Sequence, residues 1–416
     1  MRTELINVGT ELLMGNVVNT NAAYLSKECT KLGYGVYYQT VVGDNEERLK
    51  DAIETARKRA ELIILTGGLG PTEDDMTKEM TASVFQKQLV EDNSVKEEIL
   101  QFFQKKGKKN IPVSNWKQSL VIEGAIVLHN ENGTAPGLIL EEDSTIVVLL
   151  PGPPKELLPM FQKQVIPYLA SKQNQFFYTK MVKICGVGES AVEERIKDLI
   201  DQQTNPTIAT YAKSGEVHIR VTASGKDETE AKKLGKPVVK ELKHRFGIAV
   251  YTTEEEVSLE ECVVKLLKKH DLTLVTAESC TGGLIAATVI NVPGSSSVIK
   301  ESFVTYSNKA KRKHLDVSKN TLKKYTEYSD KCAKEMARGA ALVNDSDVSI
   351  AVTGIAGPDG GTEEKPVGLV YIACYVKEKV IVKEFHFRGS RELIRELSVV
   401  NGLDLLRRAL IENYES

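Results

Sequence analysis

The 416-residue sequence lacks the patterns that mark several classes of protein. Its six cysteines and six histidines are scattered, with no CxxC pair and no HxxxH spacing, which argues against a zinc knuckle or a disulfide framework. No apolar run is long enough to span a bilayer. The formal net charge is only −2, so no general attraction to nucleic acid or to an anionic membrane is expected. We therefore expect a cytoplasmic protein with reduced thiols, in which any metal site is built on carboxylates.

The chain is too long for one ordinary domain, and its patterns divide it into three parts. Residues 1–170 alternate strand and helix signals, which predicts a doubly wound α/β/α domain. A polar linker over 170–175 leads to a predicted small α+β module of KH or ferredoxin type at 176–252. Residues 258–416 return to an α/β pattern. The predicted fold class is therefore α/β, with an α+β module in the middle.

The most informative segment is Ala277–Gly283, which lies between a predicted strand at 272–276 and a predicted helix at 284–290. A serine at such a junction, Ser279, sits where a helix N-terminus offers free N–H groups. A hydroxyl nucleophile beside N–H donors is the arrangement that acyl transfer requires. The alternative interpretation is a serine N-cap followed by glycines that permit tight packing.

A second segment, Phe303–Lys311, ends a predicted strand and begins a helix. If Asn308 caps that helix, Lys311 falls in its first turn. Both the helix dipole and burial would lower the pKa of this lysine, which makes a neutral amine base feasible. The alternative is a surface lysine on an exposed helix. A third segment, Thr353–Pro358, follows another predicted strand, and its glycines could line a phosphate pocket.

Together these segments resemble the C-terminal domain of the CinA family, which also occurs alone as the nicotinamide mononucleotide (NMN) deamidase PncC. The resemblance is carried by A-E-S-C-T-G-G at 277–283, N-V-P-G-S-S at 291–296, V-T-Y-S-N at 304–308, T-G-I-A-G-P at 353–358 and K-P-V-G at 365–368. It implies hydrolysis of the carboxamide of NMN to nicotinic acid mononucleotide and ammonia, without a cofactor.

In the mechanism that this resemblance implies, Ser279 attacks the amide carbonyl, and Tyr306 and Lys311 carry the proton to the departing ammonia. Lys309 stands where many family members carry an acidic residue, so either Lys309 or Lys311 could be the base, and spacing favours Lys311. Cys280 is an alternative nucleophile. The backbone near Thr281, Gly282 and Gly283 is expected to hold the oxyanion. The substrate-binding residues expected besides these three are Thr353, Gly354 and Gly357.

The N-terminal third carries a series of loops, each at the carboxyl end of a predicted strand, where open α/β sheets bind ligands. They are G-T-E-L-L-M-G at 9–15, V-G-D-N at 42–45, T-G-G-L-G-P-T-E-D-D-M-T at 66–77, N-G-T-A-P-G at 132–137 and P-G-P-P-K-E at 151–156. They resemble the molybdopterin-binding fold of the MoaB, MogA and gephyrin families.

These loops supply the candidate residues of a second site. Glycine N–H groups can face phosphates, and carboxylates can hold a divalent cation. Asp44 and Asp75 are the candidate metal ligands, whereas the neighbouring Asp74 is more typical of a turn. The candidate ligand-binding residues are Glu11, Gly67, Gly68, Gly70, Thr134, Gly152 and Lys155.

The whole architecture resembles full-length CinA, which implies hydrolysis of ADP-ribose to AMP and ribose 5-phosphate with Co, Mn or Mg in the N-terminal domain. The middle module lacks a basic GxxG loop, because Gly186–Glu189 ends in an acid, so RNA binding is not expected. We expect small nucleotides as partners, no direct nucleic acid or membrane contact, and a homodimer. The alternatives are a molybdopterin-binding protein and a non-enzymatic competence or DNA-damage factor.

Overall fold

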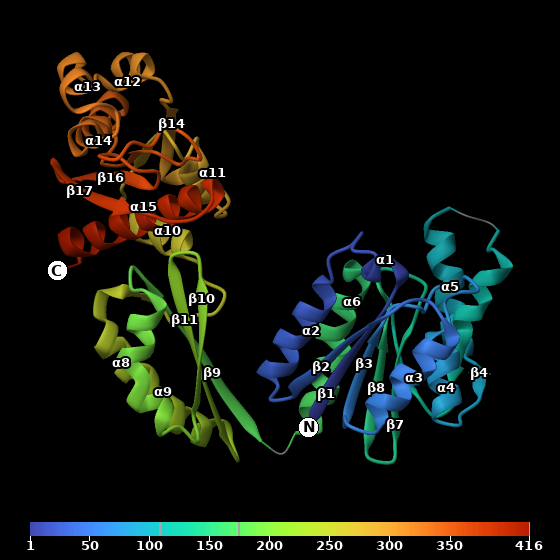
Figure 1. The fold of residues 1–416 in the computed structure, drawn as a ribbon. Coiled ribbons are helices and arrows are strands. Elements are labelled where there is room, and N and C mark those ends of the chain that lie inside the picture. The colour runs from blue at the N-terminus through green and yellow to red at the C-terminus, as the bar shows by residue number, and fades with distance from the viewer. Residues whose placement is uncertain (108–109, 174, 416) are drawn as a thin grey trace. The chain divides into compact units, whose positions relative to one another are not determined.

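The structure is a computed structural model that describes residues 1–107, 110–173 and 175–415. The chain forms two compact units, Met1–Phe177 with Gly225–Asp227, and Tyr178–Ser224 with Glu228–Ser416 (Figure 1). In the described part of the chain no helix is both long and apolar enough to cross a membrane. Residue 174, within the expected linker at 170–175, lies outside the described residues.

The first unit is built on a six-stranded sheet of order β2-β1-β3-β8-β7-β6. Its strands β1, β2, β3 and β8 run parallel, and β7 and β6 add antiparallel at one edge. The strands are β1 (Arg2–Val8), β2 (Gly35–Val42), β3 (Leu62–Thr66), β6 (Ile126–Leu128), β7 (Gly137–Glu142) and β8 (Thr145–Leu150). A short antiparallel pair, β4 (Leu89–Glu91) and β5 (Leu120–Ile122), lies outside this sheet.

Helices cover both faces of this sheet, which confirms the doubly wound prediction. One apolar cluster packs Leu25 of α2 and Phe161 against the sheet, and a second packs Ile53 of α3 and Ile99 of α5 against the other face. Because both faces are covered, every residue of β3 is buried, as its continuous apolar run predicts. The helices are α1 (Thr10–Leu13), α2 (Thr20–Lys31), α3 (Glu46–Arg57), α4 (Thr77–Val84), α5 (Asn93–Lys105), η1 (Val113–Ser119), α6 (Pro154–Met160), η2 (Phe161–Val165) and α7 (Ile166–Ser171).

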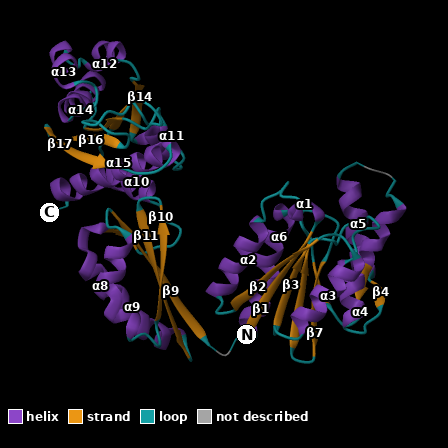
Figure 2. Ribbon diagram, in the orientation of Figure 1, coloured by secondary structure: helices purple, strands orange, loops and turns teal. Residues whose placement is uncertain are grey.

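The second unit begins with the predicted α+β module, a four-stranded sheet of order β10-β11-β9-β12 with two main helices (Figure 2). Side chains of both helices share one apolar cluster with the strands. Its elements are β9 (Phe176–Cys185), α8 (Glu189–Asp201), β10 (Thr207–Lys213), β11 (Glu216–Gly225), α9 (Glu228–Phe246), η3 (Gly247–Ala249) and β12 (Val250–Thr252).

The rest of the second unit is a five-stranded sheet of order β14-β13-β15-β16-β17, again between two layers of helices. α10, α11 and α15 pack on one apolar cluster and α14 on another. The elements are α10 (Leu259–Lys269), β13 (Leu274–Glu278), α11 (Leu284–Ile290), η4 (Ser295–Ser297), β14 (Ile299–Val304), α12 (Asn308–Leu315), α13 (Lys319–Tyr325), α14 (Asp330–Asn344), β15 (Val348–Gly354), β16 (Leu369–Val376), β17 (Lys379–His386) and α15 (Arg391–Tyr414).

Helix α15 joins the module to this larger domain. Arg408 donates to the carbonyl of Cys185 at 2.8 Å, and Arg407 donates to the carbonyl of Ile248 at 2.6 Å. Both arginines also pair with the buried Asp404. The Gly186–Glu189 loop of the module lines a cavity together with Asn401 of α15.

Candidate active sites

The C-terminal site is centred on a buried serine–lysine pair. Lys311 Nζ donates to Ser279 Oγ at 2.9 Å and to the carbonyl of Thr305 at 2.7 Å. Ser279 is 6% exposed and Lys311 only 1%. Ser279 directly follows β13, and Lys311 lies in α12, which follows the neighbouring parallel strand β14. The alternative of an exposed surface lysine is therefore wrong.

Burial lowers the pKa of Lys311 from the ordinary lysine value, and this effect outweighs the attraction of the Glu327 carboxylate. The dipole argument needs one correction, because the helix is capped by Ser307 and not by Asn308. Lys311 nevertheless stays in the first turn, where a positive charge is disfavoured. Lys309 lies exposed on the same helix, so the geometry favours Lys311 as the base.

The amide groups at the start of α11 are already bound. The carboxylate of Glu278 is fully buried and accepts from the N–H groups of Gly283 at 3.0 Å, Ile285 at 3.1 Å and Ala286 at 2.9 Å. The Gly282 N–H donates to the carbonyl of Ser279 at 3.1 Å. The prediction that Gly282 and Gly283 hold an oxyanion is therefore wrong, because the helix N-terminus has bound the nearest carboxylate.

The backbone of Cys280 and Thr281 remains as a source of oxyanion donors. Within the described chain, neither N–H group has a backbone or carboxylate partner, and both lie close to the Cys280 sulfur. Burial raises the pKa of the Cys280 thiol to about 11, despite these N–H groups. A thiol with that pKa is almost entirely protonated at neutral pH, which argues for Ser279 as the nucleophile.

The serine opens onto a pocket of about 240 Å³. Tyr306 stands at its mouth, 64% exposed, and its hydroxyl accepts from Arg391 at 3.2 Å. Arg391 also donates to the carbonyl of Gly357 at 2.6 Å. Among the described residues, Tyr306 forms no hydrogen bond to Ser279 or Lys311. The pocket is lined by Ser279, Cys280, Tyr306, Ser307, Asn308, Glu327, Tyr328, Gly354, Ile355, Ala356, Gly357, Asp359, Gly360 and Arg391.

Sequence reasoning missed Arg391, although its position carries a signal. Arg391 is the first residue of α15, where the helix dipole disfavours a positive charge. An arginine at this position therefore indicates a role other than stabilising the helix. Of the expected substrate-binding residues, Gly354 and Gly357 line the pocket. Thr353 does not line it, because its buried hydroxyl donates to the carbonyl of Glu327 at 2.7 Å. Thr353 therefore positions the loop that carries Glu327.

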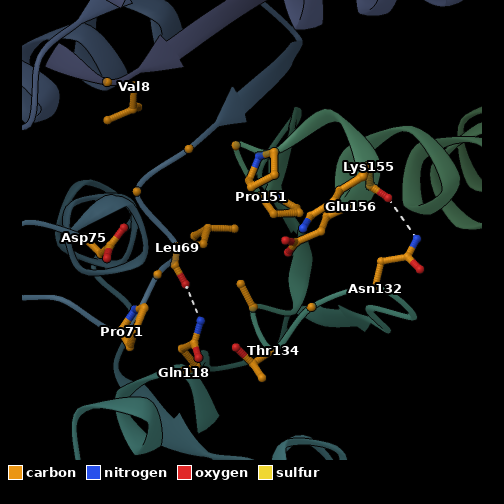
Figure 3. A pocket seen from close by; sticks show the side chains of 18 of the residues that line it. Val8, Leu69, Pro71, Asp75, Gln118, Asn132, Thr134, Pro151, Lys155 and Glu156 are labelled. Atoms are coloured by element: carbon orange, nitrogen blue, oxygen red, sulfur yellow. Dashed lines mark hydrogen bonds between the residues drawn. The ribbon is translucent and has the colours of Figure 1, made fainter. Parts of the chain in front are cut away.

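The N-terminal site is a larger pocket of about 510 Å³. All the residues predicted for this site line it, namely Glu11, Asp44, Gly67, Gly68, Gly70, Asp75, Thr134, Gly152 and Lys155. In Figure 3 the segment with Leu69, Pro71 and Asp75 borders the pocket together with segments that carry Thr134 and Lys155. Its loops follow strands that are neighbours in the sheet, which is why residues far apart in sequence meet here.

Two glycines of this pocket leave room for close contacts. Gly67 has φ +93°, and a Cβ there would lie 2.3 Å from the carbonyl oxygen of Val8. A Cβ on Gly70 would lie 2.3 Å from Asp75 Oδ2. A side chain at Gly67 would therefore force its loop away from the end of β1, whereas one at Gly70 would displace the Asp75 carboxylate.

The two candidate metal ligands are partly engaged by threonines. Asp44 Oδ2 accepts from the N–H and hydroxyl of Thr10, each at 2.9 Å. Asp75 Oδ2 accepts from the N–H of Thr72 at 2.9 Å and from its hydroxyl. The described residues contain no group of three or more His, Cys, Asp and Glu side chains that could hold a metal. Asp44 and Asp75 both line the pocket, and carboxylate oxygens are the kind of ligand that hard divalent ions prefer.

Two lysines that sequence reasoning missed hold the loop with Asp75. Lys117 Nζ donates to the carbonyl of Thr72 at 3.0 Å and to that of Asp75. Lys78 is buried and donates to the carbonyls of Lys117 at 3.0 Å and Leu120 at 2.7 Å. Burial lowers the pKa of Lys78 to about 8. Lys117 therefore ties this loop to η1, and Lys78 ties α4 to η1 and to β5.

The fold and the two pockets define a multidomain protein with a molybdopterin-binding type of α/β domain, a KH-like module and a serine–lysine site. Residues 4–171 match the family described as "Probable molybdopterin binding domain", residues 179–252 the "Damage-inducible protein CinA KH domain", and residues 256–410 the "CinA C-terminal domain". The chain belongs to the CinA family.

Full-length relatives are similar over the whole chain. A CinA-like protein of Dictyoglomus turgidum is 51% identical over 411 residues, covering 99% of this chain and 100% of that protein. A CinA-like protein of Kosmotoga olearia is 49% identical over 412 residues, covering 99% of each. The competence/damage inducible protein CihA from Agrobacterium tumefaciens, a crystal structure, is 41% identical, covering 36% of this chain and 93% of that chain at a TM-score of 0.36.

Proposed function

We propose that the C-terminal site is a serine amidase that hydrolyses NMN to nicotinic acid mononucleotide and ammonia. The observation that carries this proposal is the 2.9 Å contact between the buried Lys311 Nζ and Ser279 Oγ. A lysine whose pKa is lowered by burial can take a proton from serine without a histidine.

In the first half of the reaction, Ser279 Oγ bonds to the carboxamide carbon while its proton moves to the lone pair of neutral Lys311. The carbon–nitrogen bond then breaks, and Lys311 returns the proton to the departing nitrogen, which leaves as ammonia. The N–H groups of Cys280 and Thr281 are the proposed donors to the oxyanion. The product of this half is an ester between Ser279 and the nicotinoyl group.

In the second half, a water molecule loses a proton to Lys311 and its oxygen bonds to the ester carbon. The bond to Ser279 Oγ breaks, and Lys311 gives the proton back to that oxygen. The hydrogen bond from Lys311 to the carbonyl of Thr305 holds the amine in place through both halves. Free enzyme and nicotinic acid mononucleotide result.

Arg391 is the proposed contact for the phosphate of the nucleotide, since it is the arginine that lines this pocket and a guanidinium suits phosphate geometry. Tyr306, hydrogen-bonded to Arg391, is placed with the phosphate in this proposal and not in the proton path. Tyr306→Phe should then raise KM more than it lowers kcat. A loss confined to kcat would return Tyr306 to the proton path.

For the N-terminal site we propose metal-dependent hydrolysis of ADP-ribose to AMP and ribose 5-phosphate. Asp44 and Asp75 would hold the ion together with the pyrophosphate, and Lys155 would neutralise phosphate charge. When bound, a divalent ion supplies Lewis-acid activation of the phosphoryl group. The N–H groups of Gly68 and Gly70 would orient the phosphates, whereas the predicted donor Gly67 is already engaged, because its N–H donates to the carbonyl of Leu150 at 3.0 Å.

A second candidate for this site is a phosphorylated pterin, favoured by the family match of residues 4–171. The tests are ammonia release from NMN and AMP release from ADP-ribose with Mg, Mn or Co, each beside Ser279→Ala and Asp75→Asn. Loss of ammonia release only in Ser279→Ala, and of AMP release only in Asp75→Asn, supports both assignments. No ammonia release from the unaltered protein would refute the amidase.

A further inference from the structure

The pocket beside Ser279 carries charges of opposite sign on different segments. Of the described residues that line it, Arg391 begins α15, whereas Glu327 lies between α13 and α14. A second carboxylate, Asp359, belongs to the loop that follows Gly357, whose carbonyl accepts from Arg391. Glu327 therefore supplies negative charge on a segment separate from the arginine and its loop. Such a pocket suits a ligand with an anionic group at one end and a positive charge elsewhere.

The segment that carries Glu327 is fixed through its backbone. Lys365 Nζ donates to the carbonyls of Tyr325 at 2.8 Å and Tyr328 at 2.9 Å. The hydroxyl of Thr353 donates to the carbonyl of Glu327 itself at 2.7 Å. Because these bonds engage the backbone, the side chains of Glu327 and Tyr328 are left to line the pocket. Lys365 belongs to the K-P-V-G segment, to which neither proposed reaction assigns a role.

The Glu327 carboxylate is available to a ligand. It is half-buried and accepts from Asn308 Nδ2 at 3.2 Å, and in the described part of the chain it forms no ion pair. It attracts Lys311, but that amine must be neutral to act as the proposed base. A partly buried carboxylate without an ionic partner is unfavourable, so a cation bound beside it would be stabilised.

An aromatic ring stands next to this carboxylate in the sequence. Tyr328 is half-buried and lines the same pocket. Burial raises the pKa of its hydroxyl, and the Glu327 carboxylate adds to that effect, so the tyrosine is uncharged at neutral pH. An uncharged aromatic face and a carboxylate both attract an organic cation.

The pyridinium ring of NMN is such a cation, and its charge disappears when the ring is reduced. We infer that Glu327 and Tyr328 form a subsite that recognises the positive charge of this ring and thereby selects oxidised over reduced nicotinamide nucleotides. With the carboxamide at Ser279 and the phosphate at Arg391, the ring is left to lie beside Glu327 and Tyr328. This inference rests on the proposed amidase reaction and names the feature of the substrate that determines its specificity.

The test compares the binding of NMN with that of its reduced form, dihydronicotinamide mononucleotide. The two share the amide, the ribose and the phosphate, but the reduced ring is neutral. Titration calorimetry on the full-length Ser279→Ala variant measures both affinities without turnover. NMN should bind at least about 10-fold more tightly, because only its ring is attracted by the carboxylate and the aromatic face.

Glu327→Gln in the same background keeps the shape of the side chain and removes its charge. The ratio of the two affinities should fall to about 2 or less, with the loss in NMN binding. The variant also removes a charge that attracts Lys311, but a less protonated lysine would favour the cationic ligand, so this effect opposes the predicted fall. Glu363→Gln is the matched control and should leave the ratio unchanged, because Glu363 is exposed and is not among the described residues that line the pocket.

The inference is overturned if the Ser279→Ala protein binds the reduced form as tightly as NMN. It is also overturned if Glu327→Gln leaves the ratio of affinities unchanged. Failure of the proposed amidase is a different result, since it would appear as absent NMN binding together with absent ammonia release. NMN that is bound and hydrolysed without this selectivity would refute the inference alone.

Discussion

The two pockets of this chain occupy corresponding places in two α/β domains, beyond the carboxyl ends of parallel strands, yet they are equipped in opposite ways. The C-terminal pocket is lined by Ser279, whose hydroxyl contacts Lys311, and both side chains are almost fully buried. The N-terminal pocket is about 510 Å³ against about 240 Å³, and presents glycines and accessible carboxylates.

The difference shows two ways of placing reactivity on similar folds. Where the protein supplies the proton carrier itself, burial must shift the pKa of that group, and the site is small and closed around it. Where charge on a ligand must be neutralised, as we propose for the N-terminal pocket, N–H groups and carboxylates at an open rim can bind phosphates and a divalent ion.

Replacing Lys311 with Met should have the largest effect. It removes the proposed base and should lower ammonia release from NMN roughly 10³-fold, as expected for loss of a general base. AMP release from ADP-ribose should not change. Lys309→Met, on the exposed side of the same helix, is the control and should stay close to the unaltered rate. Equal losses in the two variants would contradict the assignment of the base.

Removing divalent ions should lower the activity proposed for the N-terminal pocket and leave that of the C-terminal pocket unchanged. A chelator, or Asp75→Asn, should lower AMP release from ADP-ribose by about 10- to 100-fold, because carboxylate ligands and their surroundings control ion affinity. Ammonia release should continue at its original rate. Restoration by added Mg, Mn or Co would identify the ion. Unchanged AMP release in the chelator would rule out a metal-dependent step.

Glu278→Gln should destabilise the second unit. The amide replaces a carboxylate oxygen that receives backbone N–H groups, so at least one bond is lost at a fully buried site. We expect a loss of about 1–3 kcal/mol in the free energy of unfolding. Thermal unfolding of the variant, compared with the exposed control Glu363→Gln, measures it. An unchanged midpoint would show that the carboxylate does not hold the start of α11.

The rate of ammonia release from NMN should depend on pH. The pKa of Lys311 is lowered by burial, and only the neutral amine can take the serine proton. Ammonia release should therefore rise with pH, about tenfold per unit, up to a midpoint below the ordinary lysine value of 10.5. A profile for kcat that stays flat below that midpoint would argue against a neutral lysine.

Much of the fold could be read from local patterns. The apolar run of β3 and the strand–serine–helix junction at Ser279 both occur where the sequence predicted them, because short-range periodicity and turn residues determine them. Helices α4 and α5 and the β4–β5 pair were not anticipated. Helix α4 has eight residues and the two strands have three each, and the burial of these elements depends on packing against elements distant in sequence.

The residues of the two sites also fall into those that the sequence predicted and those that only the structure revealed. Sequence alone brought together nine of the residues that line the N-terminal pocket, because each lies in a loop beside the sheet, but it missed Phe102 of α5 and Gln118 of η1. It also named Ser279 and Lys311. Only the tertiary structure decided that Lys311 is buried against Ser279 and that Glu278 occupies the start of α11. It also showed that Arg391, more than 100 residues beyond Ser279, lines the same pocket. Burial and hydrogen-bond partners across the sheet are properties of the packed chain, and no local pattern encodes them.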